Sequence, residues 1–301
     1  MPQRVRPEIQ LNDGATPQKV ELEELFNHGR WKKPYTIKHF LFCLYLPIGL
    51  VLWPFKIIFT ALLFFIALVG PKSISTKTRH LVKYTMGIRY DLKGAEHIPK
   101  KGDPSAARIL VCNHLTDFDP YPLYLVLEGY HVLVASHIKN VPVVGKAYEK
   151  LNTIYVDQTN KAKAREDVLN SLNKSDLPLL LYPEGGLTNG KAGLMMFQKF
   201  VFGLGHSVLP IAMKLENTWP VHVDYINSSW FKNFFWWMLI PYHTFSLEFL
   251  PPVSINSNET DSDFASRVQN IIANHLNIEA TPYFYSQKKE LAKKLLSQRK
   301  E

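Results

Sequence analysis

Residues 41–69 read LFCLYLPIGLVLWPFKIIFTALLFFIALV, an almost unbroken apolar stretch in which Lys56 is the one charged residue. A helix that is apolar on all sides is buried either in a large core or in a membrane. The stretch lies behind polar sequence and too far from residue 1 to be an ordinary cleaved signal peptide. A membrane segment is therefore the favoured interpretation, and a buried core helix is the alternative.

Pro47 and Pro54 interrupt the stretch and favour a bent segment. Each half around Trp53-Pro54 offers roughly 20 Å of helix, whereas the hydrocarbon core of a bilayer is roughly 30 Å thick. A straight span would place Pro54 and Lys56 in mid-membrane, where both are costly. Basic residues flank the stretch on both sides, at Arg30, Lys32, Lys33, Lys38, Lys72, Lys77, Arg79 and Lys83. Because positive charge marks the cytoplasmic side, we predict a hairpin that enters and leaves through the cytosolic leaflet, with both termini cytosolic.

The formal net charge of +9 fits either nucleic acid or an anionic membrane surface as a partner. Because this charge brackets the apolar stretch and no nucleic-acid recognition motif is present, we expect membrane lipids as partners and no nucleic acid. The two cysteines, Cys43 and Cys112, are too few for a disulfide framework or a zinc site. We therefore expect a cytosol-facing protein without a bound metal.

Polar sequence without periodicity at residues 1–30 predicts a loose cytosolic tail, and the hairpin with its basic flanks follows at 31–85. Within 86–280, short apolar runs alternate with helical patterns, which is typical of an α/β protein. Helices are predicted at 161–172 and 261–276. Strands are predicted at 109–112, 131–136, 153–157, 177–183, 207–213, 221–226 and 244–250.

Two further segments have more than one interpretation. Residues 231–242, FKNFFWWMLIPY, are too short to cross a bilayer and rich in aromatic residues. They fit a helix at the headgroup level of a membrane or an aromatic core segment equally well. Residues 281–301 predict a basic helix, which we interpret as a solvated tail with membrane or partner binding as the alternative.

Two loops that follow apolar strands carry residues capable of chemistry. The first, VCNHLTDFDP at 111–120, supplies His114 with two nearby carboxylates, Asp117 and Asp119. Such a loop is either a solvated turn or a general base with its carboxylate partner. The second, YPEGGLTNG at 182–190, brings a glutamate and two glycines, whose backbone can approach a ligand closely. Each motif alone is also explained by an ordinary turn.

Together, a strand ending in NHLTDFD and a later strand ending in YPEGGLTNG resemble the first and third blocks of the glycerophospholipid acyltransferase family. The family signatures are His-x4-Asp and Pro-Glu-Gly, and their order, spacing and strand contexts agree with this chain, as does the membrane segment upstream. The resemblance implies a central mixed sheet flanked by helices, with an N-terminal membrane hairpin. Residues 86–280 would then be an acyltransferase-like domain.

The same resemblance implies transfer of a fatty acyl group from acyl-CoA, as co-substrate, to the hydroxyl of a lysophospholipid or glycerophosphate. It implies no cofactor and no metal. His114 would take the hydroxyl proton, and Asp119 would hold its ring and stabilise the imidazolium. On the substrate side it implies Asn113, which also positions the turn, and Glu184, Gly185 and Gly186.

Two departures from the family pattern bear on the acceptor. Members that act on phosphate-bearing acceptors commonly read Pro-Glu-Gly-Thr-Arg, whereas this chain has Gly186-Leu187 at the last two places. A second arginine is expected where this chain has Gln158. Arginine is the residue best suited to bidentate phosphate contact. The lysines that could substitute as point charges are Lys191, Lys199, Lys139 and Lys146.

Within the superfamily, PLLLYPEGGLTNGKAGLMMF, SSWFKNFFWWMLIPY and DFASRVQNIIANHL resemble the ancient ubiquitous protein branch of lipid droplets and the endoplasmic reticulum. Members of that branch usually continue into a ubiquitin-binding CUE domain, for which this sequence has no room. One hypothesis is therefore an acyltransferase of the endoplasmic reticulum membrane and lipid droplets. The other is a catalytically weak or inactive scaffold for protein degradation or droplet organisation, with ubiquitin-pathway proteins as partners.

Overall fold

A seven-stranded mixed sheet forms the centre of the protein in the computed structural model, which describes residues 20–69, 72–100, 102–103, 105–140, 149, 152–157 and 159–298. The strand order is β1-β8-β7-β2-β5-β3-β4, in which β7 and β8 pair antiparallel and all other neighbours pair parallel. The strands are β1 (Ile88–Lys93), β2 (Ile109–Cys112), β3 (His131–Ala135), β4 (Thr153–Val156), β5 (Leu179–Leu181), β7 (Val208–Glu216) and β8 (His243–Phe249). A separate parallel pair joins β6 (Gly193–Leu194) to β9 (Glu279–Ala280).

The predicted α/β fold with a central mixed sheet is confirmed, and one predicted strand is wrong. Strand β1 was not predicted, and residues 221–226 form no strand beyond an isolated bridge between Val221 and Trp31. The alternation that suggested a strand is real, since Val221 and Val223 are buried. However, this loop is bonded to the N-terminal segment, through His222 N to Arg30 O at 2.7 Å.

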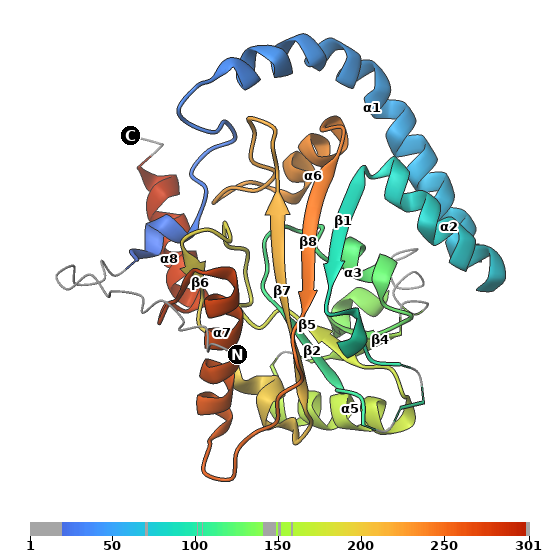
Figure 1. Cartoon of the computed structure of the whole chain (residues 1–301), viewed down its shortest axis with the longest axis vertical. Coiled ribbons are helices and arrows are strands. Elements are labelled where there is room, and N and C mark those ends of the chain that lie inside the picture. The colour runs from blue at the N-terminus through green and yellow to red at the C-terminus, as the bar shows by residue number, and fades with distance from the viewer. Residues whose placement is uncertain are drawn as a thin grey trace, which may run out of the picture.

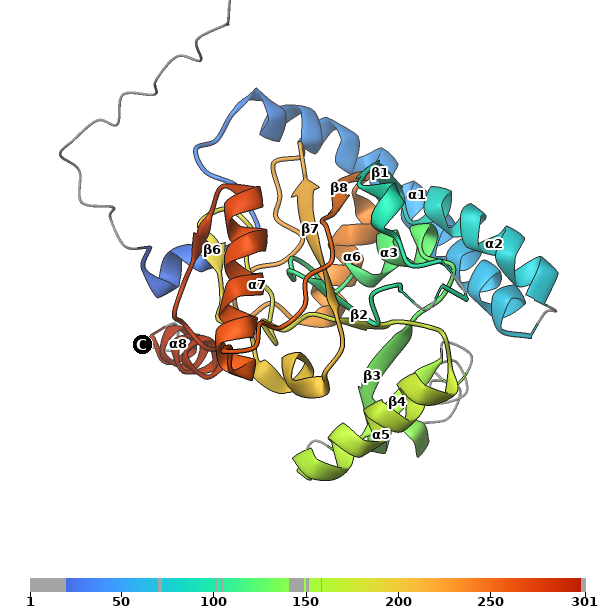
Figure 2. The same ribbon diagram turned by 60° about the horizontal axis from the view of Figure 1, so that its bottom comes forward.

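Helices cover both faces of the sheet, and the sequence of the central strand explains why. Ile109 and Val111 of β2 join one buried cluster, whereas Leu110 and Cys112 join the other, on the opposite face. A strand that is apolar at every position is covered on both sides. The helices are α2 (Lys72–Thr85), α3 (Pro120–Val126), α5 (Lys161–Lys174), α6 (Trp230–Leu239), α7 (Asp261–Leu276) and α8 (Tyr285–Ser297). Figure 2 shows α5 beside β3 and β4, and α7 standing away from the α1 side of the molecule.

The apolar stretch folds as one helix, α1 (Ile37–Val69), and the turn predicted at Trp53-Pro54 is wrong. The helix passes through both prolines and curves over one side of the domain (Figure 1). Contacts with α6 support it next to the prolines, with Trp53 Nε1 donating to Phe235 O at 3.2 Å and Lys56 Nζ to Ile240 O at 2.9 Å. Proline therefore bends this helix without breaking it, and the chain reverses only after Val69, into α2.

The side of α1 that faces away from the domain is apolar and exposed. Among the described residues, α1 is the one helix long and apolar enough to cross a membrane, and only 6% of its most apolar window is buried. Its 33 residues correspond to about 50 Å of helix. Exposed apolar side chains run along it at Ile37, Phe40, Leu41, Leu44, Ile48, Val51, Phe55, Ile58, Phe59, Leu62 and Phe65. They continue onto α6 at Trp230 and Phe231.

Both ends of the described chain pack against the domain. The predicted loose tail at 1–30 is wrong for residues 20–30, where η1 (Leu22–Leu25) buries Leu25 completely, and residues 1–19 lie outside the described residues. The basic helix at the other end is α8, whose Leu291 is buried in the same apolar cluster as Leu25. The prediction of a solvated helix is therefore wrong, because its leucine face has a partner that the local sequence does not reveal.

Candidate active site

The first motif loop leaves β2 at Cys112 and enters α3 at Pro120. Asn113 fastens the start of this loop, because its Nδ2 donates to Met213 O at 3.0 Å and its Oδ1 accepts from Met213 N at 2.8 Å. Both contacts are to β7, and the side chain is fully buried. Asn113 thus holds the loop against β7 through both polar atoms of its amide, and its contact with a substrate stays a prediction.

His114 follows directly and is paired with Asp119. The Nδ1 atom of His114 lies 2.9 Å from Asp119 Oδ2. The same oxygen accepts from the backbone N–H groups of Leu115, at 2.5 Å, and Thr116, at 3.0 Å. Burial raises the pKa of Asp119, while its hydrogen bonds act in the opposite direction. A carboxylate that accepts from Nδ1–H leaves the lone pair of the imidazole on Nε2.

The Nε2 side of the ring is available for chemistry. The His114 side chain is 20% exposed, and no hydrogen bond to Nε2 occurs within the described part of the chain. The ring stacks on Tyr182, with ring centroids 4.3 Å apart and planes inclined by 21°. Tyr182 directly precedes the second motif, and its role was not predicted. A fixed ring with one exposed basic nitrogen is the arrangement that a general base requires.

Glu184 joins the two motifs through both of its carboxylate oxygens, and its contact with a substrate stays a prediction. Its Oε1 accepts from His114 N at 2.8 Å, and its Oε2 accepts from Met195 N at 2.9 Å. The side chain is fully buried. Burial raises the pKa of Glu184 from 4.5 to about 8, although the two N–H donors favour the carboxylate. Glu184 therefore fixes the backbone of the loop that carries His114, and it does so from the buried side of that loop.

The two glycines allow close packing. Gly185 has a φ of +71°, which side chains rarely adopt, and a Cβ there would lie 2.3 Å from Gln198 Nε2. At Gly186 a Cβ would lie 2.6 Å from the ring of Tyr285 on α8. One side of Gly186 is therefore packed against α8, and the residue is half-buried.

Asp117, the other carboxylate of the loop, points away from His114. Its Oδ2 accepts from Asn233 Nδ2 on α6 at 3.2 Å. Asn233 also donates to Asp224 and accepts from Arg30 at 3.0 Å. Burial, followed by the charge of Asp117, raises the pKa of Asp224 to about 7. This polar group ties the motif loop to α6.

Lys191, Lys199 and Lys139, three of the proposed substitute lysines, form no described contact with His114. Lys191 and Lys199 are exposed, and Lys139 lies over the ring of Tyr155 on β4. Lys146 and Gln158 lie outside the described residues. At Leu187 the neighbouring cation is instead Lys288 of α8, whose Nζ donates to Leu187 O at 2.6 Å. The separation of 101 residues explains why no local sequence signal identified it.

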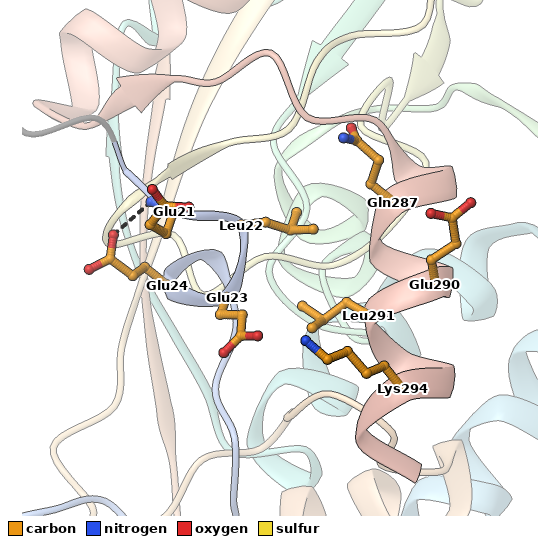
Figure 3. A pocket seen from close by; sticks show the side chains of 8 residues that line it. All are labelled: Glu21, Leu22, Glu23, Glu24, Gln287, Glu290, Leu291 and Lys294. Carbon is orange, nitrogen blue, oxygen red and sulfur yellow. Dashed lines mark hydrogen bonds between the residues drawn. The ribbon is translucent and has the colours of Figure 1, made fainter. Parts of the chain in front are cut away.

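A groove elsewhere in the described structure does not include His114 in its lining. It has a volume of about 790 Å³ and lies between η1 and α8, where Leu22 and Leu291 point into it from opposite sides (Figure 3). Its polar lining consists of Glu21, Glu23, Glu24, Gln287, Glu290 and Lys294. Among the described residues, no three His, Cys, Asp or Glu side chains are grouped to hold a metal ion. The candidate active site is therefore located from the geometry around His114 and not from the volume of a cavity.

Comparison with known proteins finds a matching domain model and several relatives. Residues 89–214 match the acyltransferase family model. The chain is 27% identical over 273 residues to the lipid droplet-regulating VLDL assembly factor AUP1 of Danio rerio, covering 91% of this chain and 62% of that protein. It is 28% identical over 207 residues to the lysophospholipid acyltransferase LPEAT2 of Arabidopsis thaliana, covering 64% of this chain and 37% of that protein.

The fold is also known from a crystal structure. The 1-acyl-sn-glycerophosphate acyltransferase PlsC of Thermotoga maritima matches with a TM-score of 0.50 and 17% identity, covering 80% of this chain and 97% of that one. The matched domain, the shared fold and the two motifs are consistent with the glycerophospholipid acyltransferase superfamily. Over most of its length it is similar to the AUP1 proteins, and it spans about three fifths of the length of those from Danio rerio and Xenopus tropicalis.

Proposed function

We propose that the protein transfers a fatty acyl group from acyl-CoA to the hydroxyl of a lysophospholipid or glycerophosphate. The observation that carries this proposal is the pair of His114 Nδ1 and Asp119 Oδ2, with Nε2 of the same ring left exposed. A hydroxyl is too weak a nucleophile to attack a thioester unless a base removes its proton in the transition state. His114 is the residue in this site that is placed to do so.

In the proposed reaction, Nε2 of His114 takes the proton as the hydroxyl oxygen attacks the thioester carbonyl. The tetrahedral intermediate collapses, the carbon–sulfur bond breaks, and the CoA thiolate receives the proton from the imidazolium. Asp119 stabilises the imidazolium between these two steps. Glu184 and Asn113 fix the backbone on either side of the base.

The exposed apolar surface of α1 and α6 supports attachment to a membrane or a droplet. Because one side of α1 is bound to α6, we propose that the helix lies along a single leaflet with its outer side in lipid, so that both ends of the chain stay cytosolic. Phe118 of the motif loop contacts Trp230 of α6, with ring centroids 6.4 Å apart. A lipid acceptor would then reach the base from the membrane side. The AUP1 relatives, named as lipid droplet-regulating proteins, support lipid droplets as one location, and we propose the endoplasmic reticulum membrane as the other.

The test is acyl transfer by purified protein in detergent–lipid micelles, across lysophospholipids, glycerol 3-phosphate and several acyl-CoA chain lengths. We expect release of free CoA with at least one acceptor and a loss of about 10²- to 10⁴-fold in His114→Ala. Lys199→Ala, an exposed residue without a described contact to His114, is the matched control. Equal rates in wild type and His114→Ala would refute the proposed base.

The second candidate is a scaffold that uses the acyltransferase fold to bind lipid and serves droplet organisation or protein degradation. Similarity to AUP1 proteins over 91% of this chain favours it. Ubiquitin-pathway proteins would be its partners. Absence of transfer by the wild type with every acceptor, together with intact droplet binding, would select this candidate over the enzyme.

A further inference from the structure

We propose that Lys288 of α8 forms a phosphate-binding subsite beside His114, for a phosphate carried by the acceptor or by CoA. The inference rests on the proposed acyl transfer, because it assigns a substrate group to the same site. It adds a residue from outside both sequence motifs. It also gives the C-terminal helix a direct part in substrate recognition.

The position of Lys288 follows from a short chain of hydrogen bonds. Its Nζ donates to Leu187 O at 2.6 Å. The next residue, Thr188, donates its backbone N–H to His114 O at 2.8 Å. Leu187 and Thr188, two consecutive residues of the second motif loop, thus link the ammonium group of Lys288 to the backbone of His114. A ligand group at Nζ would lie at the edge of the reaction site.

Two contacts hold this part of α8 in place. The ring of Tyr285 packs against Gly186, where even a methyl group would not fit. One turn later, the Nζ of Lys288 lies 5.0 Å from the ring centroid of Phe26. Leu291 is buried beyond it, in the same cluster as Phe26. Lys288 is therefore a fixed, partly buried cation and not a mobile surface side chain.

The charge of Lys288 has no counter-ion within the described residues. Its one described hydrogen bond is to a carbonyl oxygen, whereas an ammonium group has three donors. No carboxylate forms an ion pair with it, and partly buried charges are normally paired. The carboxyl groups of Glu184, Asp224 and Asp117 act on it only at longer range. Burial lowers the pKa of Lys288 to about 8, which an anion bound at Nζ would reverse.

The other cation near the motif loop is already engaged. The guanidinium of Arg30 donates to the backbone oxygens of His222 and Val223 and to Asn233 Oδ1. It therefore positions α6 and the 221–226 loop. The ammonium group of Lys288 has two donors without a hydrogen-bond partner among the described residues, and these can bind an incoming group. A phosphate is the anion that both substrates of the proposed reaction carry.

The test compares the wild type with Lys288→Met, Lys288→Arg and the control Lys293→Met, which changes an exposed lysine of the same helix. The acceptors are lysophosphatidic acid and a monoacylglycerol with the same acyl chain. The donors are acyl-CoA and the same acyl group on N-acetylcysteamine, which lacks phosphate. Thermal unfolding of each variant checks the fold, and Lys288→Gln repeats the comparison with a polar neutral side chain if the methionine lowers stability.

We expect Lys288→Met to raise KM about 10- to 100-fold for one phosphate-bearing substrate, with little change in kcat, and Lys288→Arg to restore most of it. A change confined to lysophosphatidic acid assigns the subsite to the acceptor headgroup, and one confined to acyl-CoA assigns it to the donor. Equal KM values in wild type and Lys288→Met, or an equal change for substrates with and without phosphate, would overturn the inference.

A binding measurement separates this inference from the proposed function. Lysophosphatidic acid, acyl-CoA and monoacylglycerol are titrated against the micelle-bound protein without the second substrate. If the wild type transfers no acyl group but binds a phosphate-bearing ligand, and Lys288→Met weakens that binding selectively, the proposed function fails and the subsite stands. Binding that is unchanged in Lys288→Met, or equally weakened in Lys293→Met, refutes the subsite.

Discussion

Asp119→Asn should remove most of the activity while leaving the fold in place. Asp119 Oδ2 accepts three hydrogen bonds, from His114 Nδ1 and two backbone N–H groups, whereas Oδ1 has no hydrogen-bond partner among the described residues. An asparagine can place its carbonyl oxygen where Oδ2 lies and its amide nitrogen where Oδ1 lies. All three bonds then survive, and the lost property is the negative charge.

The two consequences differ in size. Without the charge, the imidazolium formed at His114 loses its stabilising partner, and we expect kcat to fall by about 10²- to 10⁴-fold. The free energy of unfolding should change by less than about 2 kcal/mol, because relief of a buried charge offsets weaker hydrogen bonds. The first quantity is measured as CoA thiol release with saturating substrates, and the second by denaturant unfolding.

Asp117→Asn is the matched control, since its carboxylate accepts from Asn233 and not from His114. It should keep most of the wild-type rate. If Asp119→Asn retained wild-type kcat, Asp119 would be no more than a structural residue of the turn. If both variants lost activity equally, the distinction between the two carboxylates would be wrong.

Glu184→Gln replaces one carboxylate oxygen by an NH2 group, which cannot accept from a backbone N–H, so one of the two hydrogen bonds of Glu184 is lost. The free energy of unfolding at pH 5 should therefore fall by about 1–3 kcal/mol. The pKa of Glu184 is raised from 4.5 to about 8, so its protonated form stabilises the fold at low pH and this contribution fades as pH rises to 8. The difference in the free energy of unfolding between wild type and Glu184→Gln, measured with denaturant, should therefore be smaller at pH 8 than at pH 5. A difference that grows with pH would contradict this. The double variant Trp230→Ser/Phe231→Ser should weaken binding to vesicles about tenfold or more, as measured by sedimentation. The control Phe284→Ser, which changes an exposed residue at the start of α8, should not weaken it. An equal loss of binding in both would count against the α6 surface. Gly186→Ala should lower the unfolding temperature by displacing the ring packed on it from α8, and an unchanged value would disprove that contact.

Local sequence patterns were sufficient to predict those strands and helices whose position depends only on their own residues. The apolar runs at 109–112 and 244–250 became strands, and the helix at 261–276 was predicted with the bounds that the structure shows. Its start is marked by a capping box at Thr260 and Asp263, and its end by Asn277 in the left-handed region. These start and stop signals involve only residues that are close together in the sequence, so they can be identified without the structure.

Long-range contacts decided the rest. Pro54 predicts a turn only if nothing supports the helix around it, and the support comes from the carbonyl oxygens of α6. Asn113 and Glu184 were assigned to the substrate because their motif lies at the site. Their partners, Met213 and Met195, are visible only in three dimensions. The pairing of the histidine with its aspartate was expected from the resemblance to the His-x4-Asp signature, and the two side chains are in contact in the structure.

For the proposed acyl transfer, the apolar surface formed by α1 and the start of α6 would have a kinetic consequence. A protein that rests on a leaflet along the length of a 33-residue helix meets its acceptor in two dimensions. The concentration that governs saturation is then the mole fraction of acceptor in the surface, and not its amount per volume of solution. Adding inert phospholipid at a constant total amount of acceptor should slow the reaction by dilution within the surface. A growing droplet whose monolayer fills with other lipids would slow it in the same way, without any regulator binding the protein.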